Sequence, residues 1–213
     1  MQFPNALEGV KKVYQAEILF VISGALAVVA AILALAGGAA GVGIGVAVGV
    51  VLLFSVPVLG IISFIMNIVG MNKAKKDDPA FRNALYATVI GIAASVLLGI
   101  SGRETESILS IVGDTLTNVC LFLSTFFTCS ALIRLAKALG NSGMMEKGEK
   151  ARSVLTTVYI ACIGLSAVSA VFVKARNAAV ITSVILLDSA VLRFVAYVIY
   201  LRFLGKARTM LEA

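Results

Sequence analysis

Long apolar stretches alternate with short polar segments along the whole chain. No charged residue occurs among the 55 residues from Ile18 to Asn72. In a helix, with a rise of about 1.5 Å per residue, this stretch extends about 80 Å, whereas the hydrocarbon core of a membrane is about 30 Å thick. The stretch therefore fits two membrane crossings. Gly37-Gly38 provides a break between them, and Asp78-Pro79 is a start signal for the next helix.

The same pattern continues to the end of the chain and predicts an all-α integral membrane protein with six transmembrane helices. The expected helices cover residues 17–36, 42–70, 80–100, 108–138, 152–173 and 178–206 of a single membrane domain, 1–213. We expect them to form three hairpins. Asn5 and Glu8 have the spacing of a capping box, which favours a short interfacial helix before the first span. The polar segment 141–150 is expected to be a loop.

Composition agrees with a membrane protein. The chain is 60% hydrophobic and its mean hydropathy is +1.03, well above the values of an ordinary soluble domain. A chain of 213 residues cannot hide six helices that are apolar on all sides from water. We expect an integral protein of a bacterial cytoplasmic membrane.

The positions of the basic residues predict the orientation. Fourteen of the eighteen Lys and Arg residues fall in four clusters, at 11–12, 73–82, 134–152 and 202–208. The middle of each intervening stretch carries few: none at 37–41, then Arg103, then Lys174 with Arg176. Because basic residues accumulate on the cytoplasmic side, we expect both termini and the loops 71–81 and 141–151 to lie there.

A spacing of about 70 residues recurs. Lys12, Arg82 and Arg152 each open an odd-numbered helix, and Gly70 and Gly140 each close an even-numbered one. The hairpins could be parallel repeats about an axis along the membrane normal. Regular helix lengths in a six-helix protein of this size would give the same spacing, and both interpretations stay open.

Charge and residue usage restrict the function classes. The net charge of +7 comes from basic residues placed where helices leave the membrane, without base-stacking aromatic residues beside them. We therefore expect no nucleic-acid partner, but the lipid bilayer itself and an anionic lipid at the cytoplasmic basic rim. The absence of His and the isolated positions of the three Cys residues predict no metal, cofactor or disulfide and disfavour an enzyme.

Asp188 is the first candidate ligand-binding residue. It lies about ten residues into the sixth expected helix, which is about 15 Å from the outer edge. An ionised Asp at that depth costs about 2.5–3.5 kcal/mol. Its carboxylate must be paired, protonated or next to water. It is either an ion or substrate site or one partner of a structural interhelical hydrogen bond.

Arg193 and Asp114 are the other two candidates. Arg193 lies about 140° around the helix from Asp188. It either extends to the cytoplasmic edge or binds an anionic group inside the bundle. Asp114 lies inside the membrane if its helix starts at Ile108, or caps a span over 115–135. In the second case Thr117 and Asn118 could extend a polar path inward.

Small residues recur every four positions on two neighbouring helices. The two stripes are Gly41, Gly45 and Gly49, and Ala87, Gly91, Ser95 and Gly99. Such stripes allow close approach of helices in membranes. We expect the second and third helices to pack near Gly45 and Gly91, with homo-oligomerisation as the alternative use of the stripes.

These observations favour a small transporter or channel-like protein with the intramembrane charges along its path. The alternative is a non-catalytic membrane subunit or scaffold that binds a partner protein or a lipid. An enzyme acting on lipids within the membrane is the third hypothesis, and it has few residues capable of acid–base chemistry.

Overall fold

A computed structural model describes the backbone of residues 2–39, 43–100, 108–172 and 178–213. The surroundings of side chains 34–35, 37–46, 53, 98–112, 114 and 166–190 are not described. The chain is 93% helical, and the described residues contain no strand. The helices are α1 (Pro4–Ala39), α2 (Gly43–Ala74), α3 (Ala80–Ile100), α4 (Ile108–Ala138), α5 (Ser142–Phe172) and α6 (Ala178–Glu212).

The helix bounds differ from the sequence prediction mainly at the end that carries the termini. α1 begins at Pro4, so the expected interfacial helix and the first span are one continuous helix. The expected loop 141–150 is instead the first part of α5. Its Lys, Glu and Met residues are good helix formers, and the Asn141 side chain accepts a hydrogen bond from the Met144 amide at 3.0 Å as an N-cap. Gly140 at φ 68° ends α4.

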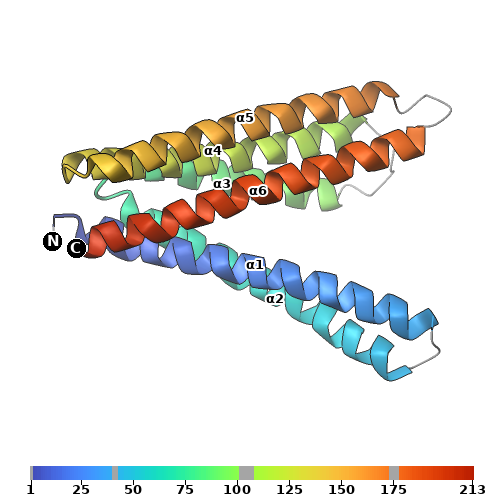
Figure 1. The fold of residues 1–213 in the computed structure, drawn as a ribbon. Helices are drawn as coiled ribbons and strands as arrows, with labels where there is room; N and C mark the ends of the chain where they lie inside the picture. Colours follow the sequence, from blue (N-terminus) through green and yellow to red (C-terminus); the bar gives the residue numbers. More distant parts are fainter. Residues whose placement is uncertain (1, 40–42, 101–107, 173–177) are drawn as a thin grey trace.

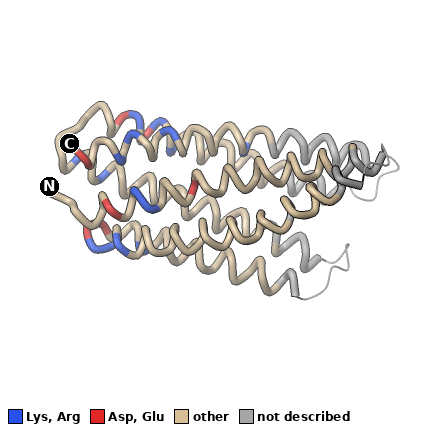
Figure 2. The backbone as a smooth tube through the Cα atoms, turned by 90° about the horizontal axis from the view of Figure 1, so that it is seen from below, with Lys and Arg blue, Asp and Glu red and all other residues tan. Residues whose placement is uncertain are grey.

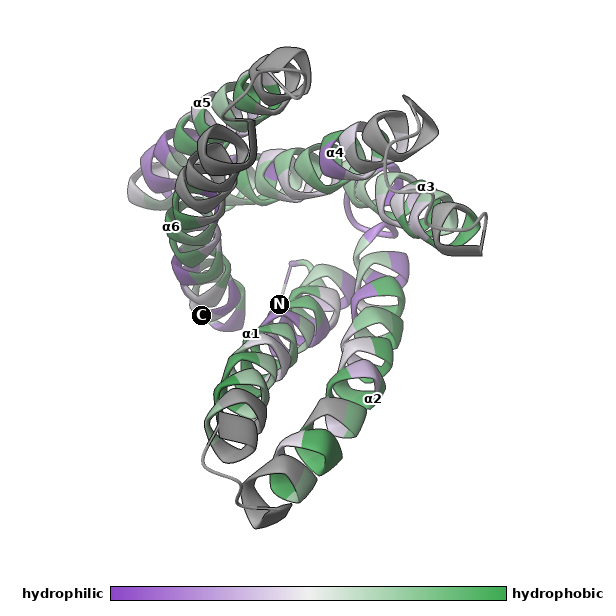
Figure 3. Ribbon diagram, turned by 90° about the vertical axis from the view of Figure 1, so that its right-hand side faces the viewer, coloured by the Kyte–Doolittle hydropathy of each residue, from purple (hydrophilic) through white to green (hydrophobic). Residues whose placement is uncertain are grey.

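The six helices pack in ring order. Each helix contacts the next one in the sequence, and α6 returns to contact α1 (Figure 3). α1 and α2 form the most extensive contact, whereas α2 and α3 contact each other sparsely. The α1–α2 pair diverges from the other four helices with distance from the termini (Figure 1).

The expected packing of the second and third helices through their small residues is wrong at Gly91. A Cβ atom at Gly91 would lie 2.8 Å from the Cβ of Cys120 on α4, so this glycine serves the α3–α4 contact. The side-chain surroundings of Gly45 lie outside the description. The closest helix crossing is at Gly9 and Gly70, where a Cβ on either residue would come within 2.7 Å of the other's carbonyl oxygen.

The hydrophobic core lies at the end of the bundle that carries both termini. Phe81, Leu132, Tyr200 and Leu204 are buried there. Most of the charged residues among the described parts gather around the same end, and Figure 2 shows them in blue and red beside the two termini. We call this region the terminal end.

Two adjacent aspartates tie the helices together at the terminal end. Asp77 accepts hydrogen bonds from the Ala6 amide at 2.7 Å and from the Asn5 side chain at 2.9 Å, so it caps the start of α1. This replaces the expected capping box. Asp78 caps α3 through the Ala80 amide, as the sequence predicts, at 2.7 Å. It also accepts two hydrogen bonds from Arg134 of α4, at 2.6 and 2.9 Å.

The outer surface of the described helices is strongly apolar. Phe54 is 75% exposed, Val51 68% and Leu97 66%, more than a water-soluble protein would leave uncovered on neighbouring turns. Four described segments are long and apolar enough to cross a membrane, namely Pro4–Leu33, Ala47–Ala74, Ala80–Leu97 and Thr115–Ala138. These features are compatible with a membrane protein.

Candidate functional site

A cavity of about 440 Å³ lies inside the ring, and every helix contributes to its wall. Its polar lining residues are Glu17 of α1, Ser63 and Asn67 of α2, Thr88 and Ser95 of α3, Thr117, Ser124 and Thr125 of α4, Tyr159 of α5 and Tyr197 of α6. The size is that of a pocket for a small organic molecule. A largely apolar cavity that contains a carboxylate and several other polar groups, between helices with apolar outer surfaces, is the strongest candidate site in the described structure.

Glu17 carries the only acidic side chain in the cavity lining. Its Oε2 atom accepts a hydrogen bond from the Tyr197 hydroxyl at 2.5 Å, and its Oε1 atom accepts one from the Asn67 Nδ2 atom at 3.0 Å. A carboxylate has about four acceptor positions, so part of its capacity remains free. No ion pair between Glu17 and a basic side chain occurs in the described part of the chain.

The cavity holds unused acceptors, whereas several of the donors around it are already engaged. The Oδ1 atom of Asn67 is buried and has no hydrogen-bond partner within the described structure. The Ser63 hydroxyl donates to the Ala16 carbonyl oxygen at 2.7 Å. The Thr88 and Ser124 hydroxyls share a hydrogen bond of 2.7 Å. A ligand that brings N–H donors or a positive charge would therefore match the free groups.

Aromatic rings form part of the wall near Glu17. The Phe20 and Tyr197 ring centroids are 6.3 Å apart, and Phe64 and Tyr159 also line the cavity. Aromatic faces attract cations. The rings therefore favour the same kind of ligand as the carboxylate.

Several polar residues of the cavity lie at a similar depth relative to the basic rim, whereas Ser95 and Thr117 lie deeper. Five of them lie five to seven residues inward from a Lys or Arg of the same helix: Glu17 from Lys12, Asn67 from Lys73, Thr88 from Arg82, Tyr159 from Arg152 and Tyr197 from Arg202. This spacing corresponds to about 8–10 Å along a helix. These five residues thus form a layer beneath the charged terminal end, which we call the cavity layer.

Arg193, the one predicted site residue whose side chain is described, does not line the cavity but lies one helical turn from Tyr197, which does. The Nη1 atom of Arg193 donates to the Asn118 Oδ1 atom on α4 at 3.0 Å, and its buried Nε atom has no partner in the described structure. The side chains of Asp188 and Asp114 lie outside the described residues. Because α4 begins at Ile108, Asp114 lies within the helix and is not its N-cap. Ligand binding by these three residues stays a prediction.

Sequence reasoning missed Glu17 and Asn67. The prediction placed Glu17 at the first residue of a membrane helix, where a carboxylate would lie in the polar interface and be solvated by water. In the structure α1 starts thirteen residues earlier, at Pro4, and Lys11 and Lys12 mark the rim. The signal that could have identified both residues is their similar distance along the helix from a basic residue of the rim, Lys12 for Glu17 and Lys73 for Asn67. Thr117, which the prediction placed on a possible polar path, lines the cavity.

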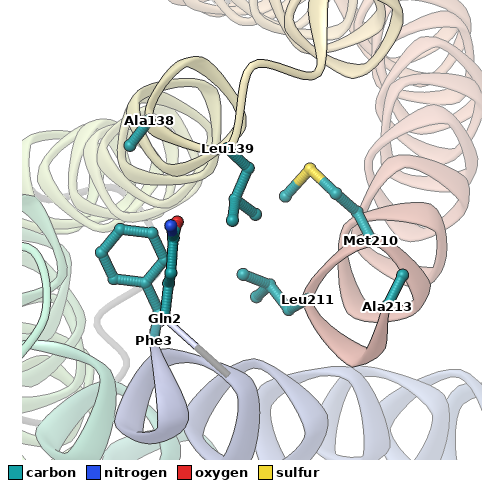
Figure 4. Close-up of a pocket in the computed structure, with 7 residues that line it drawn as sticks. All are labelled: Gln2, Phe3, Ala138, Leu139, Met210, Leu211 and Ala213. Carbon is teal, nitrogen blue, oxygen red and sulfur yellow. The ribbon is translucent and has the colours of Figure 1, made fainter.

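A second cavity, of about 330 Å³, lies at the terminal end (Figure 4). Its lining residues are Gln2, Phe3, Ala138, Leu139, Met210, Leu211 and Ala213. Gln2 has the only polar side chain among them, so this cavity offers little chemistry. The described residues contain no group of three or more Cys, Asp or Glu that could hold a metal ion. Cys120, Cys129 and Cys162 are buried and free of disulfides.

Comparison of the chain with protein-family models, curated proteins and solved structures finds no match.

Proposed function

We propose that this protein is a six-span integral membrane protein and a small transporter of organic cations such as protonated amines. The cavity inside the helix ring is its binding site, and Glu17 supplies the negative charge that balances the ligand. The observation that carries the proposal is the Glu17 carboxylate in a cavity lined by all six helices, without a basic partner in the described residues. An ionisable side chain within the membrane-spanning part of a protein is by default a hypothesis for a functional site.

The ligand class follows from the unused groups in the cavity. Glu17 and the free Oδ1 atom of Asn67 both accept hydrogen bonds, which an ammonium group would donate. Phe20 and Tyr159 add aromatic surface. In the absence of such a ligand, a proton on Glu17 would neutralise the same charge. The proposal therefore includes exchange of the cation against protons.

Ligand binding would also weaken a hydrogen bond that connects the α1–α2 hairpin to α6. The Tyr197 hydroxyl bridges α6 to α1 through Glu17, and the α1–α2 pair makes only sparse contact with α3 on its other side. A cation at Glu17 would compete with Tyr197 for the carboxylate oxygens. The divergence of α1 and α2 from the remaining helices (Figure 1) supports movement of this hairpin as the route to the cavity.

The test is binding and uptake by purified protein in liposomes. Tetraethylammonium and protonated benzylamine serve as probes, and internal pH is recorded. We expect Glu17→Gln to abolish probe-dependent proton release and to weaken probe binding at least about tenfold, which corresponds to about 1.4 kcal/mol. The matched control is Glu149→Gln, which removes an exposed carboxylate on α5. Equal binding by the parent protein and Glu17→Gln would refute the assignment.

The proposed orientation places both termini in the cytoplasm. It is supported by the basic clusters of the sequence and by their position around the terminal end (Figure 2). After replacement of the three native Cys residues, single Cys substitutions at Lys75 and at Glu104 can be labelled in intact cells. Labelling from outside at 104 and not at 75 is expected. The reverse pattern would invert the topology.

A further inference from the structure

A groove between α5 and α6 combines basic and apolar side chains on the outer surface of the ring. Its volume is about 260 Å³. The lining residues are Lys147, Lys150, Ala151, Val154, Ile199, Arg202, Phe203 and Lys206. Half of these are basic and the rest are apolar.

The positive charge of the groove is not neutralised by the protein. Lys147, Lys150, Arg202 and Lys206 are exposed, and none forms an ion pair within the described residues. By contrast, Lys73 pairs with Glu8, Arg134 with Asp78 and Arg208 with Glu212. Three basic side chains at the same end of the bundle are thus internally paired, whereas the four that line this groove are not.

Two acidic residues of α5 lie near the groove but do not line it, and Glu146 lies one helical turn before Lys150, about 40° around the helix from it. Both Glu146 and Glu149 are exposed. Glu149 lies about 200° around the helix from Lys147 and about 100° from Lys150. The groove therefore presents a net positive surface to a ligand.

The arrangement of the lining matches an amphiphile. Val195, Ile199, Arg202 and Lys206 follow one another at intervals of four, three and four residues, which places them on one face of α6. This stripe is about 16 Å long. Its basic half lies at the terminal end, and its apolar half runs toward the middle of the bundle, where Val195 is 50% exposed. On α5, Val154 continues inward from Lys147 and Lys150 in the same way.

We propose that this groove binds an anionic glycerophospholipid. Lys150 and Arg202 hold the phosphate, Lys147 and Lys206 add attraction to the same negative charge from either side, and the acyl chains follow Val154 and Ile199. Basic pockets between membrane helices on the cytoplasmic side bind anionic head groups in this manner. The site shares the membrane setting of the proposed transporter but none of its cavity residues.

The experiment measures lipid binding to the purified full chain in a neutral detergent. The ligands are phosphatidylglycerol, phosphatidylcholine and the soluble glycerol phosphate, and bound lipid is counted by native mass spectrometry. The groove variant is Lys150→Gln with Arg202→Gln. The control is Lys75→Gln with Lys76→Gln, which removes two exposed charges at the same end without touching the groove.

We expect phosphatidylglycerol to bind the parent chain in preference to phosphatidylcholine. Each basic residue near an anionic surface changes affinity about fivefold, so the groove variant should bind about 25-fold more weakly. The control should stay close to the parent chain, and so should Glu17→Gln, which separates this test from that of the transporter. A second groove variant, Lys147→Gln with Lys206→Gln, should reproduce the loss.

Three results would overturn the proposal. Equal losses in the groove and control variants would show diffuse attraction to the basic end. Equal binding of glycerol phosphate and phosphatidylglycerol would show a site for free anions that makes no use of the apolar stripe. Unchanged binding in both groove variants would show that the lipid contacts another surface.

Discussion

The terminal end and the cavity layer lie within a few helical turns of each other and are built in opposite ways. At the terminal end, Phe81, Leu132 and Leu204 are buried completely or almost completely, and Asp78 accepts three hydrogen bonds, two of them from the Arg134 guanidinium. In the cavity layer, a carboxylate and an amide oxygen retain free acceptor capacity. Stability is concentrated at the terminal end, which leaves the cavity layer free to keep unsatisfied groups for a ligand. Proteins commonly separate the two demands in this way.

The largest expected effect contrasts two phenylalanines. Phe81 is 0% exposed in the core of the terminal end, and Phe64 lines the cavity. Phe81→Ala should lower the free energy of unfolding by about 3–5 kcal/mol. Phe64→Ala enlarges a space that is already open and should cost clearly less. Unfolding by denaturant in detergent micelles measures both. Equal losses would contradict the difference between the two regions.

The next effect concerns the crossing of α1 and α2 at the terminal end. Gly70→Ala places a methyl group 2.7 Å from the carbonyl oxygen of Gly9, and a backbone atom cannot rotate away. We expect a loss of about 1–3 kcal/mol. Gly24→Ala on α1 is the control, because nothing lies within 4 Å of the added methyl group. It should be neutral or slightly stabilising. A stable Gly70→Ala protein would show that the crossing is adaptable.

Asp78 should follow with a smaller effect. Asp78→Ala removes the cap of α3 and both hydrogen bonds from Arg134, for an expected loss of about 1–2 kcal/mol. The Arg134 side chain is 54% exposed, so Arg134→Gln should cost less than about 1 kcal/mol. Thermal unfolding of the two single variants separates the cap from the ion pair. Equal losses would mean that the cap contributes nothing.

The smallest effects belong to the cavity layer. The hydroxyl groups of Thr88 on α3 and Ser124 on α4 form a hydrogen bond of 2.7 Å. Thr88→Val, Ser124→Ala and the double variant form a cycle with an expected coupling energy of about 0.6 kcal/mol, as for other hydrogen bonds between membrane helices. Glu17→Gln should leave stability unchanged or raise it, because it removes a buried charge. A Glu17→Gln protein that unfolds like Phe81→Ala would assign Glu17 to structure.

Part of this picture is available from the sequence. The ranges of α3 and α4 match the predicted 80–100 and 108–138, because a local signal, Asp78-Pro79, and polar breaks mark them. The start of α1 could not be located, since its cap is Asp77, 71 residues away along the chain. The partner of Gly91 was misassigned for a related reason. A stripe of small residues indicates that another helix packs closely against it, but the stripe does not identify which helix.

The pair Asp77–Asp78 has a consequence for synthesis and insertion into the membrane. The amino end of α1 leaves the ribosome before its cap, which lies beyond the whole of α2, and Asp78 leaves it before Arg134, which lies beyond most of α4. We expect the hairpin of α1 and α2 to enter the membrane while the first turn of α1 is still uncapped. The hydrogen bonds to Asp77 form only when the segment between α2 and α3 has been made. Each aspartate thus joins a helix that is synthesised earlier to one that is synthesised later, and its hydrogen bonds can form only after both segments have been made.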